Sequence, residues 1–153
     1  MQPMITGTMN VTLEGVSIKP PGPPDTYIGT ARNFLVGVLE LANTPNCAFA
    51  LAFLAAQAAE CGLKAYLSRS GNDIRLKQNP IRHDLSALWT LAAHEGLGVA
   101  ATPPNWLSNL SQLHGAPYYL RCSIGVHGVV LPATEPMVSE LSALIENISG
   151  RLY

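Results

Sequence analysis

Charged side chains are scarce in this sequence of 153 residues, since Asp, Glu, Lys and Arg together make up 12% of it. A typical soluble domain carries about 25%. The nine basic and ten acidic residues nearly cancel and leave a formal net charge of -1, while hydrophobic residues make up 48%. This composition excludes a disordered chain, a collagen and a strongly basic tail. The length fits one globular domain with a core of its own.

The scarcity of charge also bears on how the surface is covered. With so few charges, the surface must be covered by uncharged polar groups, Gly, Pro and exposed apolar side chains. Extended apolar patches on a surface tend to be contact sites for partners. We therefore expect a homodimer, the simplest closed assembly. The alternative is a monomer whose surface is rich in Ser, Thr and Asn.

Cysteine and long apolar runs are equally limited. Cys47, Cys61 and Cys122 are an odd number without a C-x-x-C pair, which predicts a reduced, cytoplasmic protein. The most apolar run, residues 47–56, is shorter than the roughly 20 residues of a membrane span. The first ten residues contain no Lys or Arg and no apolar core of a signal peptide. We expect no contact with a membrane.

The apolar pattern predicts an all-α protein. Helical spacing of apolar residues, bounded by capping residues, Pro and Gly, recurs five times. Thr44-Pro45 and Thr102-Pro103 each place Thr at a helix cap and Pro at the first helical position. Gly62 lies inside a predicted helix and indicates close approach of a neighbouring helix. The expected helices cover residues 25–44, 45–69, 82–95, 103–115 and 134–149.

Short connections between these helices favour an up-and-down bundle that spans residues 25–153. Residues 1–24 differ from the rest, because weak two-residue alternation precedes the rigid run Pro20-Pro21-Gly22-Pro23-Pro24. They predict an extended N-terminal arm that drapes over the domain, reaches a partner or frays. Residues 116–132 carry Tyr, Val and Gly and predict an extended or hairpin segment.

Familiar catalytic motifs are missing. His94-Glu95 starts like a zinc-protease helix, but Gly98 stands where the second His is needed. The sequence has no Glu-x-x-His pair, no phosphate-binding G-x-x-x-x-G-K-[ST] loop and no G-x-S-x-G turn. We therefore expect neither a metal nor a cofactor.

Positive charge is concentrated in one part of the chain. Residues 64–82 contain five basic residues and one acidic residue, Asp73. This excess predicts a basic surface that binds phosphate or an acidic partner. The alternative is that these residues only solvate a helix end and a loop. His83 beside them is a candidate ligand-binding residue or general base. Asp84 is expected to cap the next helix. The five basic residues are Lys64, Arg69, Arg75, Lys77 and Arg82.

The stretch Ala58-Ala59-Glu60-Cys61-Gly62-Leu63-Lys64-Ala65-Tyr66-Leu67, followed by Gly71 and then by His83-Asp84-Leu85 and Leu88, resembles the HEPN (higher eukaryotes and prokaryotes nucleotide-binding) family. The resemblance extends over about residues 48–97. It implies a helical bundle, commonly dimeric, that acts on nucleotides or RNA, including toxin–antitoxin pairs with nucleotidyltransferase partners.

Active members of that family cleave RNA without metal, using Arg and a His four to six residues later on a helix. Arg121 and His127 have this spacing, but Cys122 replaces the usual polar neighbour and the stretch rich in Gly does not predict a helix. We expect a non-catalytic dimeric module that binds a nucleotide, RNA or an acidic protein. The alternatives are a metal-independent ribonuclease with a composite site of Arg121 and His127 at the dimer interface, and a purely structural scaffold.

Overall fold

The computed structural model describes residues 20–121 and 128–153, and these residues contain helices and no strand. This confirms the predicted all-α bundle of about five helices. The elements in chain order are α1 (Asp25–Leu41), α2 (Ala48–Leu67), the 3₁₀ helices η1 (Ile74–Lys77) and η2 (Ile81–His83), α3 (Leu85–His94), α4 (Asn105–His114) and α5 (Thr134–Leu152).

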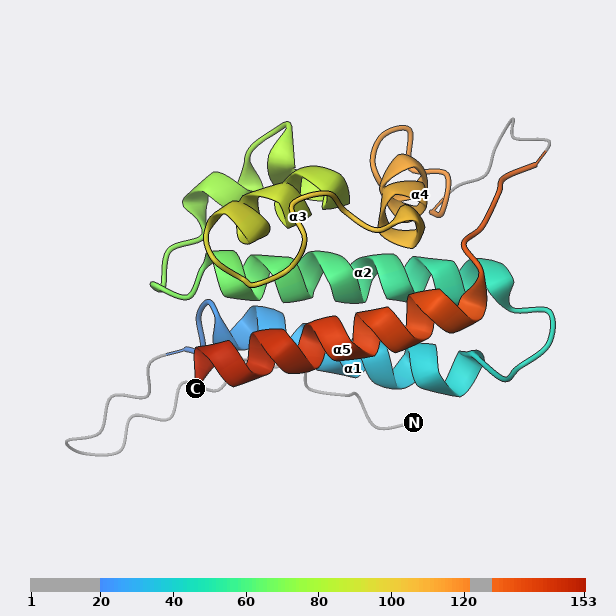
Figure 1. The fold of residues 1–153 in the computed structure, drawn as a ribbon, viewed down its shortest axis with the longest axis horizontal. Helices are drawn as coiled ribbons and strands as arrows, with labels where there is room; N and C mark the ends of the chain where they lie inside the picture. Colours follow the sequence, from blue (N-terminus) through green and yellow to red (C-terminus); the bar gives the residue numbers. More distant parts are fainter. Residues whose placement is uncertain (1–19, 122–127) are drawn as a thin grey trace, which may run out of the picture.

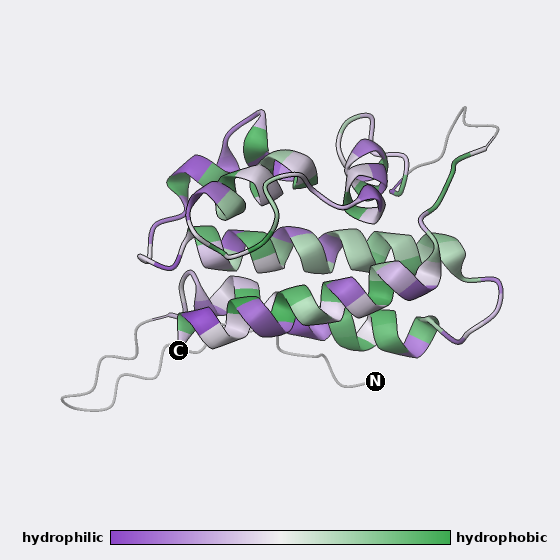
Figure 2. Cartoon of the chain, viewed as in Figure 1, coloured by the Kyte–Doolittle hydropathy of each residue, from purple (hydrophilic) through white to green (hydrophobic). Residues whose placement is uncertain are grey.

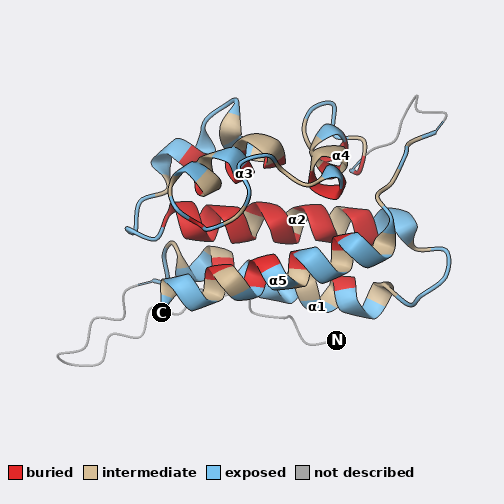
Figure 3. Cartoon of the chain, in the orientation of Figure 1, coloured by how far each residue is buried: buried red, intermediate tan, exposed pale blue. Residues whose placement is uncertain are grey.

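Helix α2 lies at the centre of the molecule. α1 and α5 pack along one side of it, and α3 and α4 lie on the other side (Figure 1). α1 and α2 run antiparallel, while α5 runs in the same direction as α2 (Figure 1). Residues of α2 are the most continuously buried of the fold (Figure 3), and most of its length is apolar (Figure 2). The small side chains of its Ala-rich sequence let neighbours approach on several sides.

Gly62 shows how tight this packing is. A Cβ atom at Gly62 would lie 2.5 Å from Cδ1 of Ile145 on α5. The prediction that Gly62 marks a close helix approach is confirmed, because α5 occupies the space that any larger residue would need. Among the described residues, α2 is also the one helix long and apolar enough to cross a membrane, but 61% of its apolar window is buried inside the bundle.

Two predicted helix starts were wrong. α2 begins at Ala48 with Cys47 at its N-cap, not at Thr44-Pro45. The Thr44 hydroxyl instead donates to the Glu40 carbonyl and closes the end of α1. α4 likewise begins at Asn105, after Pro104, rather than at Thr102-Pro103. In both cases the Thr and Pro residues lie in the connection that precedes the helix.

The helix predicted over residues 82–95 is interrupted. Asp84 has extended backbone torsions (φ -93°, ψ 98°), so the chain forms η2, turns, and then starts α3. Gly96, with φ 91°, follows α3 as expected of a helix-terminating glycine. Gly115 ends α4 as predicted, and α5 extends to Leu152, beyond the predicted end at residue 149.

The non-helical segments were predicted only in outline. Residues 20–24 carry no regular structure and lead directly into α1, while residues 1–19 lie outside the described part of the chain. Of the predicted hairpin segment 116–132, the described portions form turns and irregular chain. Residues 122–127 lie outside the description, so the hairpin stays a prediction.

Candidate functional site

Two charged side chains are buried on α2. Glu60 and Lys64 are only 6% and 5% exposed, although the other buried residues of α2 are apolar. Lys64 Nζ donates to Glu60 Oε1 over 2.6 Å, an ion pair one helical turn apart. Burial of a charge is costly unless it is paired and hydrogen-bonded. The second oxygen of Glu60 therefore also needs partners.

Two imidazoles supply them. His83, the last residue of η2, lies with Nδ1 3.1 Å from Glu60 Oε2. His114, the last residue of α4 and 1% exposed, lies with Nε2 2.5 Å from the same oxygen. The two rings meet edge to face with centroids 6.0 Å apart. We call Glu60, Lys64, His83 and His114 the Glu60 cluster; it joins α2, η2 and α4.

This arrangement keeps Glu60 ionised. Burial by itself raises the pKa of the carboxyl, but hydrogen bonds from His114, Lys64 and His83 outweigh it and lower the pKa to about 2. Nδ1 of His114 is buried and has no hydrogen-bond partner among the described residues. The lowered pKa means that Glu60 stays charged beside the two imidazoles.

A pocket of about 640 Å³ opens beside the cluster, with His83 in its wall. Its wall comes from the η1–η2 loop, the start of α3, α4 and the turn after α4. Most of the side chains are uncharged and polar. We call this cavity the His83 pocket; its lining residues are Asn79, Pro80, His83, Asp84, Ser86, Ser108, Ser111, Gln112, Gly115, Ala116 and Tyr118.

Asp84 fixes one wall of the pocket. Its carboxylate accepts from the Ala87 backbone N–H over 2.9 Å, which confirms the predicted N-cap of α3. The Ser111 hydroxyl of α4 donates to Asp84 and accepts from the Ser86 backbone N–H, both over 3.2 Å. Ser111 therefore locks α4 against the start of α3.

Tyr118 forms another wall and brings Arg121 to the site. Its backbone φ of 64° is in the left-handed region, which a bulky residue adopts only at a cost. The ring meets His83 edge to face, with centroids 6.0 Å apart, and Arg121 lies over it at 5.1 Å. Arg121 is exposed, whereas His127, its predicted catalytic partner, lies outside the described residues.

The predicted basic surface is largely neutralised in the structure. Arg75 pairs with Glu95 through two hydrogen bonds of 2.6 and 3.1 Å, and Arg69 bonds the same carboxylate over 3.2 Å. Lys77 lies 3.0 Å from Asp73. Lys64 does not belong to an exposed surface at all, because it is buried against Glu60.

Of the five predicted basic residues, Arg82 alone forms no ion pair within the described part of the chain. It is exposed and adjoins His83 in sequence. The structure thus places His83 and Asp84 in the wall of one pocket and Arg121 beside the Tyr118 ring of that wall, with Arg82 next to His83 in the sequence. Arg69, Arg75 and Lys77 do not line this pocket and belong to ion pairs with Glu95 and Asp73.

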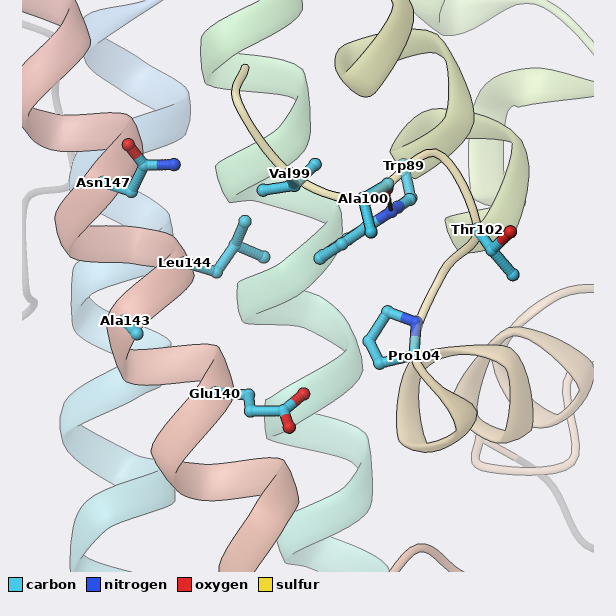
Figure 4. Close-up of a pocket in the computed structure, with 9 residues that line it drawn as sticks. All are labelled: Trp89, Val99, Ala100, Thr102, Pro104, Glu140, Ala143, Leu144 and Asn147. Carbon is cyan, nitrogen blue, oxygen red and sulfur yellow. Dashed lines mark hydrogen bonds between the residues drawn. The ribbon is translucent and has the colours of Figure 1, made fainter.

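A second cavity, of about 560 Å³, lies between α5 and the segment that joins α3 to α4 (Figure 4). Trp89, Val99 and Leu144 give it apolar walls. Two of its polar side chains are already engaged, since Glu140 accepts from Trp106 Nε1 over 2.5 Å and Asn147 donates to the Leu97 carbonyl over 3.2 Å. This cavity suits an apolar group but offers little to direct chemistry.

Sequence reasoning missed Glu60, His114 and Tyr118 as site residues. One signal was available for the first: Glu60 and Lys64 are a charged pair inside an Ala-rich apolar helix, and a charge there must find a partner. His114 carried no comparable signal, because its contact with Glu60 spans 54 positions of the chain.

Comparisons with known proteins found no family model, no curated protein and no solved structure that matches this chain.

Proposed function

We propose that the protein is a non-catalytic helical module that binds a nucleotide in the His83 pocket. The observation that carries the proposal is the composition of that pocket. Uncharged hydrogen-bonding side chains line the pocket together with a partly exposed aromatic ring, Arg121 lies over that ring, and the exposed Arg82 adjoins His83 in the sequence. The volume of about 640 Å³ falls in the range of small-molecule sites.

The lining suits a nucleobase and sugar better than a bare anion. Asn79 and Gln112 each offer both a donor and an acceptor, which matches the mixed edge of a base. The Tyr118 ring is 38% exposed and presents a surface for stacking, worth about 1–3 kcal/mol per base. The Asp84 carboxylate in the wall disfavours a phosphate deep in the pocket.

The phosphate would then lie at the margin, where the positive charge is. Arg82 is next to His83, and Arg121 lies over the Tyr118 ring. Guanidinium groups bind phosphate oxygens through paired hydrogen bonds. An acidic partner protein is supported less, because Arg69, Arg75 and Lys77 already pair with Glu95 and Asp73. Nucleotide binding is also what the HEPN resemblance implies, and a nucleotidyltransferase-like partner remains a prediction.

Calorimetric titration with AMP, GMP, CMP and UMP tests the proposal. We expect saturable binding of at least one of them, weakened about tenfold by Arg82→Gln or Arg121→Gln and weakened further as salt rises. Arg32→Gln is the matched control, since Arg32 is an exposed residue of α1. Helix α1 packs on the side of α2 opposite to α3 and α4 (Figure 1). No binding by the folded wild type, or equal loss in the control, would contradict the proposal.

Cleavage of RNA is a second candidate, favoured by the His83–Glu60 contact. An imidazole oriented by a carboxylate is the arrangement of a general base, and Arg121 lies near the same pocket. Incubation with a short single-stranded RNA separates the candidates. Cleavage that disappears in His83→Ala but persists in His94→Ala supports catalysis, whereas an intact RNA supports binding alone.

A further inference from the structure

We propose that Glu60, His83 and His114 form a binding site for a divalent transition-metal ion, with Zn²⁺ as the preferred occupant. One potential ligand atom from each residue lies within 4.8 Å of the other two. Two imidazoles and one carboxylate are a ligand set that zinc uses when its fourth position is left to water or substrate. His83 belongs to the wall of the His83 pocket, whereas Glu60 and His114 lie behind it, and an ion there would not require a bound nucleotide.

The three ligand atoms would have to move only slightly to accommodate a bound ion. Tetrahedral coordination with metal–ligand distances near 2.1 Å would place the ligand atoms about 3.4 Å apart. Glu60 Oε2 is 3.1 Å from His83 Nδ1 and 2.5 Å from His114 Nε2. The ion would replace these two contacts, so that the three groups turn slightly outward around it.

Lys64 leaves one oxygen of Glu60 for an ion. Its ammonium donates to Oε1, so that Oε2 faces the two imidazoles. A ring nitrogen ligates a metal through its lone pair, so the ion would displace the protons that His83 and His114 share with Glu60 Oε2. Metal binding should therefore release protons to the solvent.

The surroundings hold two of the three ligands firmly and leave one side open. Glu60 and His114 are buried within the bundle, and the hydrogen bond from Lys64 acts as the outer contact that orients a ligating carboxylate. His83 lines the pocket. The remaining coordination position of the ion would face that pocket and hold water.

The alternative is that the cluster is only a buried hydrogen-bond network. It would then tie α2, η2 and α4 together without an ion. A network of this kind predicts no stoichiometric metal uptake, so titration separates the two interpretations.

The test uses the full chain without an affinity tag, stripped with EDTA and then titrated with ZnSO₄ in a competition assay with a chromogenic chelator. We expect one Zn²⁺ per chain and at least a hundredfold loss of affinity in His83→Gln and Glu60→Gln. His94→Gln is the matched control, because His94 is exposed at the end of α3. Absence of stoichiometric binding, or unchanged affinity in His83→Gln, would overturn the proposal.

A second measurement does not depend on the variants folding. CoCl₂ added to the stripped wild type should give the intense visible absorption of four-coordinate Co²⁺, and Zn²⁺ should abolish it. The weak spectrum of the hydrated ion would count against the site. Nucleotide titration of the EDTA-treated protein is scored separately, so that failure of metal binding and failure of nucleotide binding are distinguishable.

Discussion

Glu60 shows most clearly what a single residue contributes to this molecule. It lies on the central helix, where a hydrophobic residue of similar volume would cost nothing in desolvation. It is instead held by one ammonium and two imidazoles from three elements. Replacement of a whole buried ion pair by apolar residues is often neutral or stabilising. Stability alone therefore does not account for the pair of Glu60 and Lys64 on this helix.

Two glycines provide a matched prediction on packing. Gly29→Ala on α1 should stabilise the fold by about 1 kcal/mol, because nothing lies within 4 Å of the new Cβ and Ala is the better helix former. Gly62→Ala gains the same propensity but forces Ile145 to move, which costs about 1–3 kcal/mol. In urea unfolding, the free energy of unfolding should therefore be higher than wild type for Gly29→Ala and lower than wild type for Gly62→Ala. Equal effects would contradict the close packing of α2 and α5.

A second prediction concerns Glu95 and pH. The hydrogen bonds from Arg75 lower the pKa of Glu95 most, burial opposes them, and Arg69 adds to the lowering from the ordinary value of 4.5. A carboxyl with a lowered pKa stabilises the fold above its ordinary value, and this stability is lost as the pH falls through the folded pKa. Arg75→Gln should cost at most about 1 kcal/mol at pH 7, because the pair is partly exposed.

Denaturation curves between pH 7 and pH 3 provide the measurement. The difference in unfolding free energy between wild type and Arg75→Gln should shrink below about pH 4.5. Arg82→Gln makes the same change of charge without removing an ion pair and should show a flat difference. If the difference in unfolding free energy between wild type and Arg75→Gln stays constant with pH, the ion pair with Glu95 does not stabilise the fold.

The limits of sequence reasoning are clearest for single residues. Asp84 was predictable as a cap because its partner lies three positions away. The pairing of Arg75 with Glu95 was not predictable, because Glu95 lies 20 positions away and meets Arg75 only where η1 lies beside the end of α3. Counting charge along the chain therefore overestimated the free positive charge of the surface.

Among the elements, the junction between η2 and α3 positions the site. Asp84 stops η2, caps α3 and accepts from Ser111, and the neighbouring His83 thereby meets Glu60. The apolar stripes predicted the helices well, because each stripe reflects burial against α2. Helix starts were less predictable, since Thr44-Pro45 and Thr102-Pro103 lie in the connections before α2 and α4 and not at the first turns of these helices.

A cap prediction follows from this junction. Asp84→Ala removes the acceptor for the Ala87 N–H and for Ser111 and should lower the unfolding free energy by about 1–2 kcal/mol. Asp84→Asn keeps a side-chain oxygen and should lose much less. Thermal unfolding followed by circular dichroism provides the ranking. Equal loss in both variants would argue against a capping role.

At the scale of the whole molecule, we expect the predicted homodimer to form through one face of α1. Val36 and Leu39 lie one turn apart and are 60% and 48% exposed. Leu39→Glu should convert a dimer to a monomer in sedimentation velocity, because a buried carboxylate without a partner opposes association. Val130→Glu, at an exposed apolar residue outside α1, is the control. A wild type that sediments as a monomer would contradict dimerisation.

The central claim, that one polar pocket beside a buried carboxylate receives a nucleotide, is tested most directly by NMR. Amide spectra of the labelled protein are recorded during titration with each of the four nucleoside monophosphates. We predict that at least one of them shifts amides concentrated in residues 79–86 and 108–121, around the lining of the pocket. Spectra unchanged by all four, or shifts confined to α1 and α5, would contradict the account.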